Sequence, residues 1–220
     1  MIELTDVYFS YEAKKPVLQG ISLTIKEGAW LTVLGHNGGG KTTLALLLNG
    51  LLLPSRGQVT VDGLATCQSG NLGAIRRSVA FVFQNPDNQI VGATVEEDVA
   101  FGPCNLGLPR GEVARRVDKA LSLLALNDYR QHAPHMLSGG QKQKVALAGA
   151  LAMEPKYIVL DEACSMLDPV SREELWQGVQ ELHENLGITV INISHFPEEA
   201  LMGDALILLA NGKVEAELCL

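Results

Sequence analysis

The chain has 220 residues, 47% of them hydrophobic, which suffices for one large domain or for a domain with an inserted lobe. Its 25 acidic residues outnumber 17 basic ones, and the net charge of -8 argues against a nucleic-acid partner, because phosphate contacts need clustered Lys and Arg. The longest charge-free apolar stretch, 42–55, is shorter than the roughly 20 residues that span a membrane. Residues 1–6 lack the features of a secretion signal. We therefore expect the chain to stay in the cytoplasm, with its four cysteines reduced.

Short runs with the character of strands recur along the chain, at 2–9, 17–25, 30–34, 57–62, 78–83, 156–160, 189–194 and 205–210. The first two are expected to form a small antiparallel sheet, and 30–34 to form a buried core strand. Helix-forming composition or spacing predicts helices at 41–53, 111–126 and 175–186.

The arrangement of these elements predicts an α/β core with an inserted helical lobe. Residues 86–153 are expected to be mostly helix and loop, whereas the segments on either side alternate between strands and helices. Asn211-Gly212 between apolar runs is typical of a hairpin turn. We find no internal repeat or linker-like tract, so we expect one cooperative domain over 1–220.

A glycine-rich loop follows the predicted core strand. Residues 35–42, Gly-His-Asn-Gly-Gly-Gly-Lys-Thr, fit the pattern G-x-x-x-x-G-K-[ST]. Its glycines allow backbone N–H groups to surround phosphates, Lys41 adds a positive charge, and the Thr42 hydroxyl can bind Mg²⁺. The alternative is a flexible turn, but a strand before and a helix after the loop favour a phosphate site. The predicted nucleotide-binding residues here are Gly35, Asn37, Gly38, Gly40, Lys41, Thr42 and Thr43.

Two further motifs follow the loop in a fixed order. The apolar run 157–160 ends in Asp161 and Glu162, which suit an Mg²⁺ contact and a base that polarises water, respectively. About twenty residues earlier, 137–141 reads Leu-Ser-Gly-Gly-Gln, where glycine N–H groups and a helix start could face a phosphate. Taken alone, the carboxylates could begin a solvated loop, and Ser138-Gly139-Gly140 could be an ordinary helix cap.

Together these motifs resemble the nucleotide-binding subunit of an ATP-binding cassette (ABC) transporter, over nearly the whole chain. The resemblance implies a P-loop NTPase (RecA-like) core with an N-terminal antiparallel β subdomain and an inserted α-helical subdomain at about 86–153. It also implies that two subunits pair head to tail. Each ATP, with Mg²⁺, would then lie between the phosphate loop of one subunit and Ser138, Gly139, Gly140 and Gln141 of the other.

The resemblance assigns roles to four more residues. Tyr11 would stack on adenine, Gln84 would contact Mg²⁺ and the attacking water, and His195 would meet the γ-phosphate as a catalytic residue with Glu162 and Gln84. Asp168 lies in the loop that would cross the dimer. Singly, Tyr11 could be a strand aromatic, Asp168 a helix cap and His195 a loop histidine. Mg²⁺ ligands would be Thr42, Gln84 and Asp161.

The segment 84–109 is similar to the energy-coupling factor (ECF) branch of this family. That branch implies separate integral membrane subunits, uptake of vitamins or transition-metal ions, and a peripheral position on the cytoplasmic face of the membrane. Its ATPases typically carry a further C-terminal extension that helps pair the subunits, whereas this sequence ends at Leu220. We therefore expect a shortened relative, a chain that pairs through the nucleotide alone, or one that needs another subunit to hold the pair together. The sequence leaves open whether the pair is a homodimer or a heterodimer.

Two other functions fit a cassette. One is a low-turnover nucleotide-binding regulatory half of a heterodimer, against which the residues Gln84, Glu162 and His195 argue. The other is a non-transport ABC protein acting on DNA or ribosomes, for which we expect a coiled-coil insertion, a second cassette or a basic patch. None is evident in the sequence.

Overall fold

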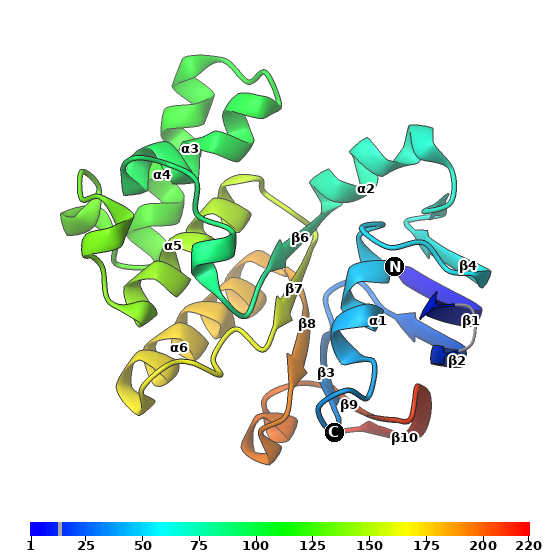
Figure 1. Cartoon of the computed structure of the whole chain (residues 1–220). Helices are drawn as coiled ribbons and strands as arrows, with labels where there is room; N and C mark the ends of the chain where they lie inside the picture. The colour runs from blue at the N-terminus through cyan, green and yellow to red at the C-terminus, as the bar shows by residue number, and fades with distance from the viewer. Residues whose placement is uncertain (13–14) are drawn as a thin grey trace. The chain divides into compact units, whose positions relative to one another are not determined.

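The computed structural model describes residues 1–12 and 15–220, and it divides them into two compact units (Figure 1). The first unit comprises 1–79, 156–162 and 187–220, and the second comprises 80–155 and 163–186. The helical subdomain expected at 86–153 falls within the second unit. That the whole chain acts as a single domain stays a prediction.

A small antiparallel sheet occupies the N-terminal part of the first unit (Figure 1). Its order is β2-β1-β4-β5, with strands β1 (Ile2–Glu12), β2 (Lys15–Ile25), β4 (Arg56–Val61) and β5 (Leu64–Ala65). On β1 and β2, buried and more exposed residues largely alternate, as expected for a sheet with one face on the core. The N-terminal antiparallel β subdomain is therefore confirmed.

The central sheet places several strand ends along one edge. Five of its strands lie in the first unit in the order β10-β9-β3-β8-β7: β3 (Trp30–Leu34), β7 (Tyr157–Asp161), β8 (Thr189–Ser194), β9 (Ala205–Ala210) and β10 (Lys213–Cys219). Strand β8 pairs in parallel with both β3 and β7, and Leu34 lies opposite Ser194. The carboxyl ends of these strands therefore meet, which is where α/β folds bind ligands.

Helix α1 (Lys41–Leu48) follows the glycine-rich loop, but it is shorter than the predicted 41–53. Gly50 adopts φ 68°, and the N–H groups of Gly50 and Leu51 donate to the carbonyls of Leu47 and Leu46 at 3.3 and 3.0 Å. This pair of bonds is the Schellman motif that ends a helix at a left-handed glycine. The leucines beyond Gly50 have helix-forming composition, but the helix ends before them. The predicted helical residues 49–53 were therefore wrong.

The second unit is mainly helical. Its larger helices are α3 (Val95–Asn105), α4 (Arg110–Leu123), α5 (Gly139–Ala152) and α6 (Pro169–Leu186). Its short 3₁₀ turns are η2 (Pro86–Asn88), η3 (Asn127–Tyr129) and η4 (Pro134–Met136). Helix α5 packs against α3, α4 and α6, and nine of its residues are buried. It is the core helix of this unit.

The remaining elements were not all foreseen. The short helix α2 (Leu72–Ser78) runs into strand β6 (Val79–Val82), which the sequence predicts, but α2 itself has a single buried residue and no periodic signal.

Among the helices of residues 1–12 and 15–220, none is both long and apolar enough to cross a membrane.

Candidate functional site

The glycine-rich loop joins β3 to α1 and has a backbone that few residues other than glycine adopt. Gly38 and Gly40 have φ values of 79° and 98°, and Gly40 is the residue before the first turn of α1. A Cβ atom on Gly35 would lie 2.1 Å from the carbonyl oxygen of Leu209. The strand, loop and helix that a phosphate loop requires are therefore present.

Lys41 is held inside this loop. Its Nζ donates to the carbonyl oxygens of Gly35 and His36 at 2.9 and 3.3 Å, and lies 3.3 Å from Oε1 of Glu162. The side chain is only 4% exposed. A buried ammonium group with backbone and carboxylate partners is available to exchange those partners for phosphate oxygens.

Thr42 and Asp161 form an oxygen-rich pair at the start of α1 and the end of β7. Thr42 Oγ1 donates to Oδ1 of Asp161 at 3.1 Å. Burial raises the pKa of Asp161 to about 6; the Thr42 hydrogen bond lowers it, neighbouring Glu162 raises it, and Lys41 lowers it. A cation beside this carboxylate would offset the cost of burying it.

This donor set fits Mg²⁺. The ion prefers hard oxygen ligands, and commonly takes one or two protein oxygens together with phosphates and water. Within the described part of the chain, no three His, Cys, Asp or Glu side chains gather where they could hold a metal ion. A site made by Thr42, Asp161 and the phosphates of a nucleotide is consistent with that finding.

Glu162 has a left-handed backbone although it is not a glycine. Its φ is 50°, in the left-handed region, and its N–H donates to the Ile193 carbonyl at 3.0 Å. The side chain, 14% exposed, lies between two nitrogens: Oε1 is 3.3 Å from Lys41 Nζ, and Oε2 is 3.3 Å from His195 Nδ1. Backbone strain of this kind is typical of functional positions.

His195 follows directly after β8 and lies beside the glycine-rich loop, with which it lines a cavity. Its ring packs on Phe196 with centroids 4.2 Å apart. A cavity of about 520 Å³ opens beside it, lined by Leu34, Gly35, His36, Asn37, His195, Pro197 and Leu208. The structure therefore brings Lys41, Thr42, Asp161, Glu162 and His195 into one site of the first unit.

Tyr11 lies near the same helix. Its hydroxyl is 3.3 Å from Thr43 Oγ1, and its ring meets the edge of Phe9 at 4.9 Å between centroids. The Tyr11 side chain is exposed, as an aromatic platform for a base would need to be. Its contact with adenine stays a prediction.

The Leu-Ser-Gly-Gly-Gln motif begins helix α5 of the second unit. Ser138 Oγ accepts from the Gln141 N–H at 3.2 Å, and Gln141 Oε1 accepts from the Ser138 N–H at 2.9 Å, forming a capping box. Gly140 packs closely, since a Cβ atom there would lie 2.5 Å from Ser171 Oγ, whereas Gly139 has open space. The motif is thus a helix cap, and the positive end of α5 is also suited to an anion.

Asp168 and Gln84 also belong to the second unit. Asp168 accepts from the N–H groups of Val170 and Ser171, each at 3.1 Å, and from Ser171 Oγ at 2.6 Å. Through these bonds Asp168 caps α6, as the alternative interpretation allows, and the bonds with Ser171 and Val170 also lower the pKa of Asp168. Gln84 Nε2 lies 3.1 Å from Ser165 Oγ. Their roles toward ATP stay predictions.

Two glutamines that the sequence analysis missed fix the backbone before Gln84. Gln89 accepts from the Phe83 N–H and donates to the Phe81 carbonyl, both at 3.1 Å. Gln143, buried on α5, donates to the Phe83 carbonyl at 3.0 Å. Glutamines in a loop and a helix look like surface residues in a sequence, so no signal singled them out.

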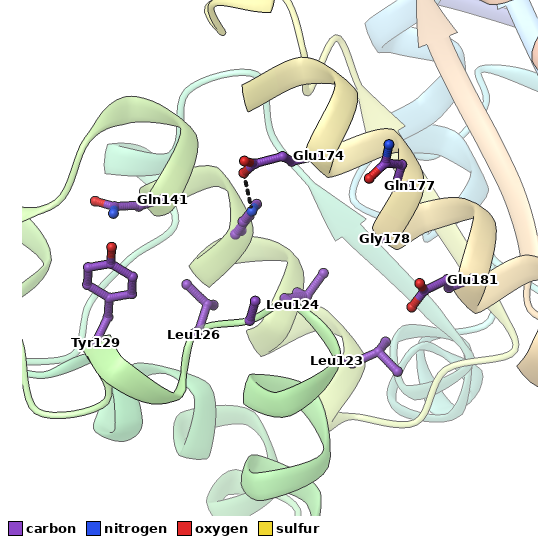
Figure 2. Close-up of a pocket in the computed structure, with 11 residues that line it drawn as sticks. Leu123, Leu124, Leu126, Tyr129, Gln141, Glu174, Gln177, Gly178 and Glu181 are labelled. Carbon is purple, nitrogen blue, oxygen red and sulfur yellow. Dashed lines mark hydrogen bonds and ion pairs between the residues drawn. The ribbon is translucent and has the colours of Figure 1, made fainter. Parts of the chain in front are cut away.

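A separate cavity of about 500 Å³ lies within the second unit, next to Gln141 (Figure 2). Leu123, Leu124 and Leu126 form an apolar part of its wall, and Glu174 and Glu181 project from α6. Glu174 is paired with Lys144 at 2.6 Å. Because Lys144 neutralises Glu174, the charge of Glu181 gives these three side chains a net negative charge, which disfavours the phosphates of ATP.

The class of phosphate-loop ATPases is defined by three features found in this site. They are a glycine loop with a buried lysine, a hydroxyl beside a carboxylate at a strand end, and a second acidic residue. Residues 18–165 match the family model described as ABC transporter. The chain belongs to the ABC transporter family, and within it to the ATP-binding proteins of the ECF type.

Curated relatives support that assignment. The ECF transporter ATP-binding protein EcfA of Syntrophomonas wolfei is 50% identical over 216 residues, which cover 98% of this chain and 79% of the relative. EcfA1 of Symbiobacterium thermophilum is 53% identical over 198 residues, covering 90% of this chain and 69% of the relative.

Solved structures show the same fold. CbiO1 from Clostridium perfringens, described as part of the ABC transporter complex cbiONQ, has a TM-score of 0.91 and 36% identity, covering 98% of this chain and 87% of its own. The cassette MJ0796, solved as a dimer in a post-hydrolysis state with ADP and Pi, has a TM-score of 0.89 and 32% identity. That match covers 100% of this chain and 98% of the other. The predicted P-loop core is thereby confirmed.

Proposed function

We propose that this chain hydrolyses Mg-ATP between two paired cassette subunits and thereby drives a membrane importer of small molecules, such as vitamins or transition-metal ions. The observation that carries the proposal is the position of Glu162. Its carboxylate lies 3.3 Å from both Lys41 and His195, beside a glycine loop built for phosphates.

The residues of the first unit divide the work of binding. The N–H groups of residues 35–40 would donate hydrogen bonds to the β- and γ-phosphates, and the Lys41 ammonium would neutralise part of their charge. Thr42 and Asp161 would hold Mg²⁺, which when bound supplies charge neutralisation across the phosphates. Lys41 now donates to Gly35 and His36, so ATP binding requires it to exchange those partners for phosphate.

Glu162 is the proposed general base. Its carboxylate accepts the proton of the attacking water, while His195, whose Nδ1 faces Glu162, steadies the carboxylate and meets the γ-phosphate. Gln84 is proposed to orient the same water. Phosphoryl transfer depends mainly on positioning and charge neutralisation, so this set of groups is sufficient.

The proposed partners follow from the second unit and the relatives. The start of α5, where Ser138 and Gly139 are exposed, would cover an ATP held by the loop of another cassette. MJ0796 forms a dimer, and CbiO1 is described as part of a transporter complex. We therefore propose pairing with a second ABC ATPase and peripheral attachment to integral membrane subunits on the cytoplasmic face.

Two variants separate binding from chemistry. Glu162→Gln should retain Mg-ATP binding but lose turnover by at least about a hundredfold, because the amide cannot accept the proton. Lys41→Ala should weaken ATP binding itself by about tenfold or more. Equilibrium binding and phosphate release measure the two effects.

The matched control is Glu217→Gln, an exposed carboxylate on strand β10. It should leave both binding and turnover unchanged. If Glu162→Gln turned over ATP at the wild-type rate, Glu162 would not be the base and the proposed mechanism would fail.

A further inference from the structure

Three polar residues with no role in the proposed chemistry lie buried behind His195. They are Thr32 on β3, Asn192 on β8 and Glu199 in the 3₁₀ turn η5 (Pro197–Met202), and they are 0%, 1% and 2% exposed. Thr32 and Asn192 lie opposite each other in the pairing of β3 with β8. Three polar side chains thus lie together among largely apolar strand residues.

Glu199 connects the other two. Its Oε2 accepts from Asn192 Nδ2 at 3.1 Å, and its backbone carbonyl accepts from Thr32 Oγ1 at 3.4 Å. Its other carboxyl oxygen, Oε1, is buried with no hydrogen-bond partner among the described residues. A leucine would fill this place without the cost of burying an unpaired oxygen, so packing alone does not account for Glu199.

The hydrogen bond between Asn192 and Glu199 joins the two ends of the segment that carries His195. Asn192 lies three residues before His195 and Glu199 four residues after it. The turn is closed further by a bond from the Glu199 N–H to the Phe196 carbonyl at 3.1 Å, and by one from the Phe196 N–H to Ser194 Oγ at 3.0 Å. With both ends of so short a segment fixed, the imidazole has little freedom to leave Glu162.

We propose that Glu199, through Asn192 and Thr32, is a positioning residue that holds His195 at Glu162 and at the γ-phosphate. Thr32 lies three residues before Gly35 on the strand that leads into the phosphate loop. The cluster therefore ties the turn of His195 to the same strand that positions the phosphates. The inference rests on the proposed role of His195.

The test exploits the polarity of the Asn192–Glu199 hydrogen bond. Asn192→Asp places two carboxyl groups against each other, which is unfavourable for the turn. We expect kcat for Mg-ATP to fall by about tenfold or more while the KM for ATP changes by less than about twofold, since the phosphate loop is intact. Adding Glu199→Gln should restore kcat, because the Gln amide can donate to the Asp carboxylate.

Further variants keep the test decisive. Glu199→Gln alone retains an acceptor for Asn192 and should keep wild-type kcat. Glu199→Met, which removes the polar group without adding a charge, should fold, bind ATP and lose kcat as Asn192→Asp does. Glu217→Gln, at an exposed position on β10, should have no effect.

The outcomes separate the inference from the proposed function. Wild-type kcat in a folded Glu199→Met protein, or no recovery in the double variant, would overturn the positioning role. Wild-type kcat in His195→Ala would instead remove the role of His195 itself, and both ideas would fall.

Discussion

At the scale of single residues, Gly35 shows how closely the phosphate loop is packed against its own sheet. A Cβ atom at this position would lie 2.1 Å from the Leu209 carbonyl on β9, far inside van der Waals contact with backbone that cannot easily move. The loop must therefore pass over β9 at a residue without a side chain.

Gly35→Ala should displace the loop and weaken ATP binding by at least about tenfold, with a loss of about 1–3 kcal/mol in the free energy of unfolding. Equilibrium ATP binding and urea denaturation measure the two losses. The matched control is Gly111→Ala in α4, where a Cβ meets nothing within 4 Å and a small gain in stability is expected. Equal ATP binding and equal stability of the two variants would contradict the clash between a Cβ at position 35 and the Leu209 carbonyl.

The structure places Lys41, Thr42, Asp161, Glu162 and His195 close together, while their roles toward ATP stay predictions. The sequence singled these residues out because each stands at a strand end or a helix start with a recognisable spacing. It did not predict Glu199 or Gln143, since burial of a glutamate or glutamine depends on packing between segments that are distant in sequence. A signal was present at Thr32 and Asn192, which are polar residues within apolar strand runs.

At the scale of elements, the two glycines that begin α5 have different tasks. Gly140 faces Ser171 of α6, where a Cβ would lie 2.5 Å from Oγ, whereas Gly139 has open space. Gly140 allows the two helices to approach, and Gly139 leaves open the positive end of α5, where we propose that a phosphate binds.

Gly140→Ala should therefore reduce the free energy of unfolding by about 1–3 kcal/mol, because α5 and α6 must separate slightly. Gly139→Ala should leave stability within about 0.5 kcal/mol and act on turnover instead. Urea denaturation of both variants compares them directly. A larger loss of stability for Gly139→Ala would contradict the packing described.

Asp62, in the turn between β4 and β5, joins the small sheet to the start of β7. It accepts from the Met1 amine at 2.7 Å, from the Tyr157 hydroxyl at 2.6 Å and from Lys156 Nζ at 3.1 Å. Burial raises its pKa, but these hydrogen bonds outweigh burial and lower the pKa from 3.8 to about 2.

The carboxylate therefore binds protons less readily in the folded chain than in the unfolded one. The stability it contributes is complete above the unfolded value of 3.8 and is lost as the pH falls through about 2. Asp62→Asn should lower the free energy of unfolding by about 1–2 kcal/mol at pH 7, and by less at pH 3. Urea midpoints at the two pH values test this, and a difference that grew toward pH 3 would refute the sign.

Element boundaries illustrate what local sequence leaves open. The apolar strands β3, β7, β8 and β9 were predicted within one or two residues, since runs of branched residues have few other structures available. The end of α1 was missed because leucines continue past Gly50, and the Schellman bonds there became evident only in the structure. The short helix α2 has too few turns to show a period.

At the scale of the whole molecule, the residues with proposed roles toward ATP are divided between the two units. The phosphate loop, Asp161, Glu162 and His195 belong to the first, whereas Gln84, Asp168 and the start of α5 belong to the second. The sequence predicted only part of this division, because the expected helical subdomain, 86–153, includes the start of α5 but neither Gln84 nor Asp168. The proposed sandwich needs the second unit of another subunit, so turnover should depend on pairing.

We propose that a second cassette completes the site of this ATPase. The most direct measurement is Mg-ATP hydrolysis by the purified chain over a wide range of protein concentrations, with Glu162→Gln in parallel and the association state followed by light scattering. The same measurement is repeated with a candidate partner ATPase and membrane subunits added, because the chain could pair with a different subunit. We predict turnover per chain that rises with pairing, and ATP-dependent dimers that accumulate in the variant. Turnover per chain that is independent of concentration and of partner, from a protein that stays monomeric, would contradict the account.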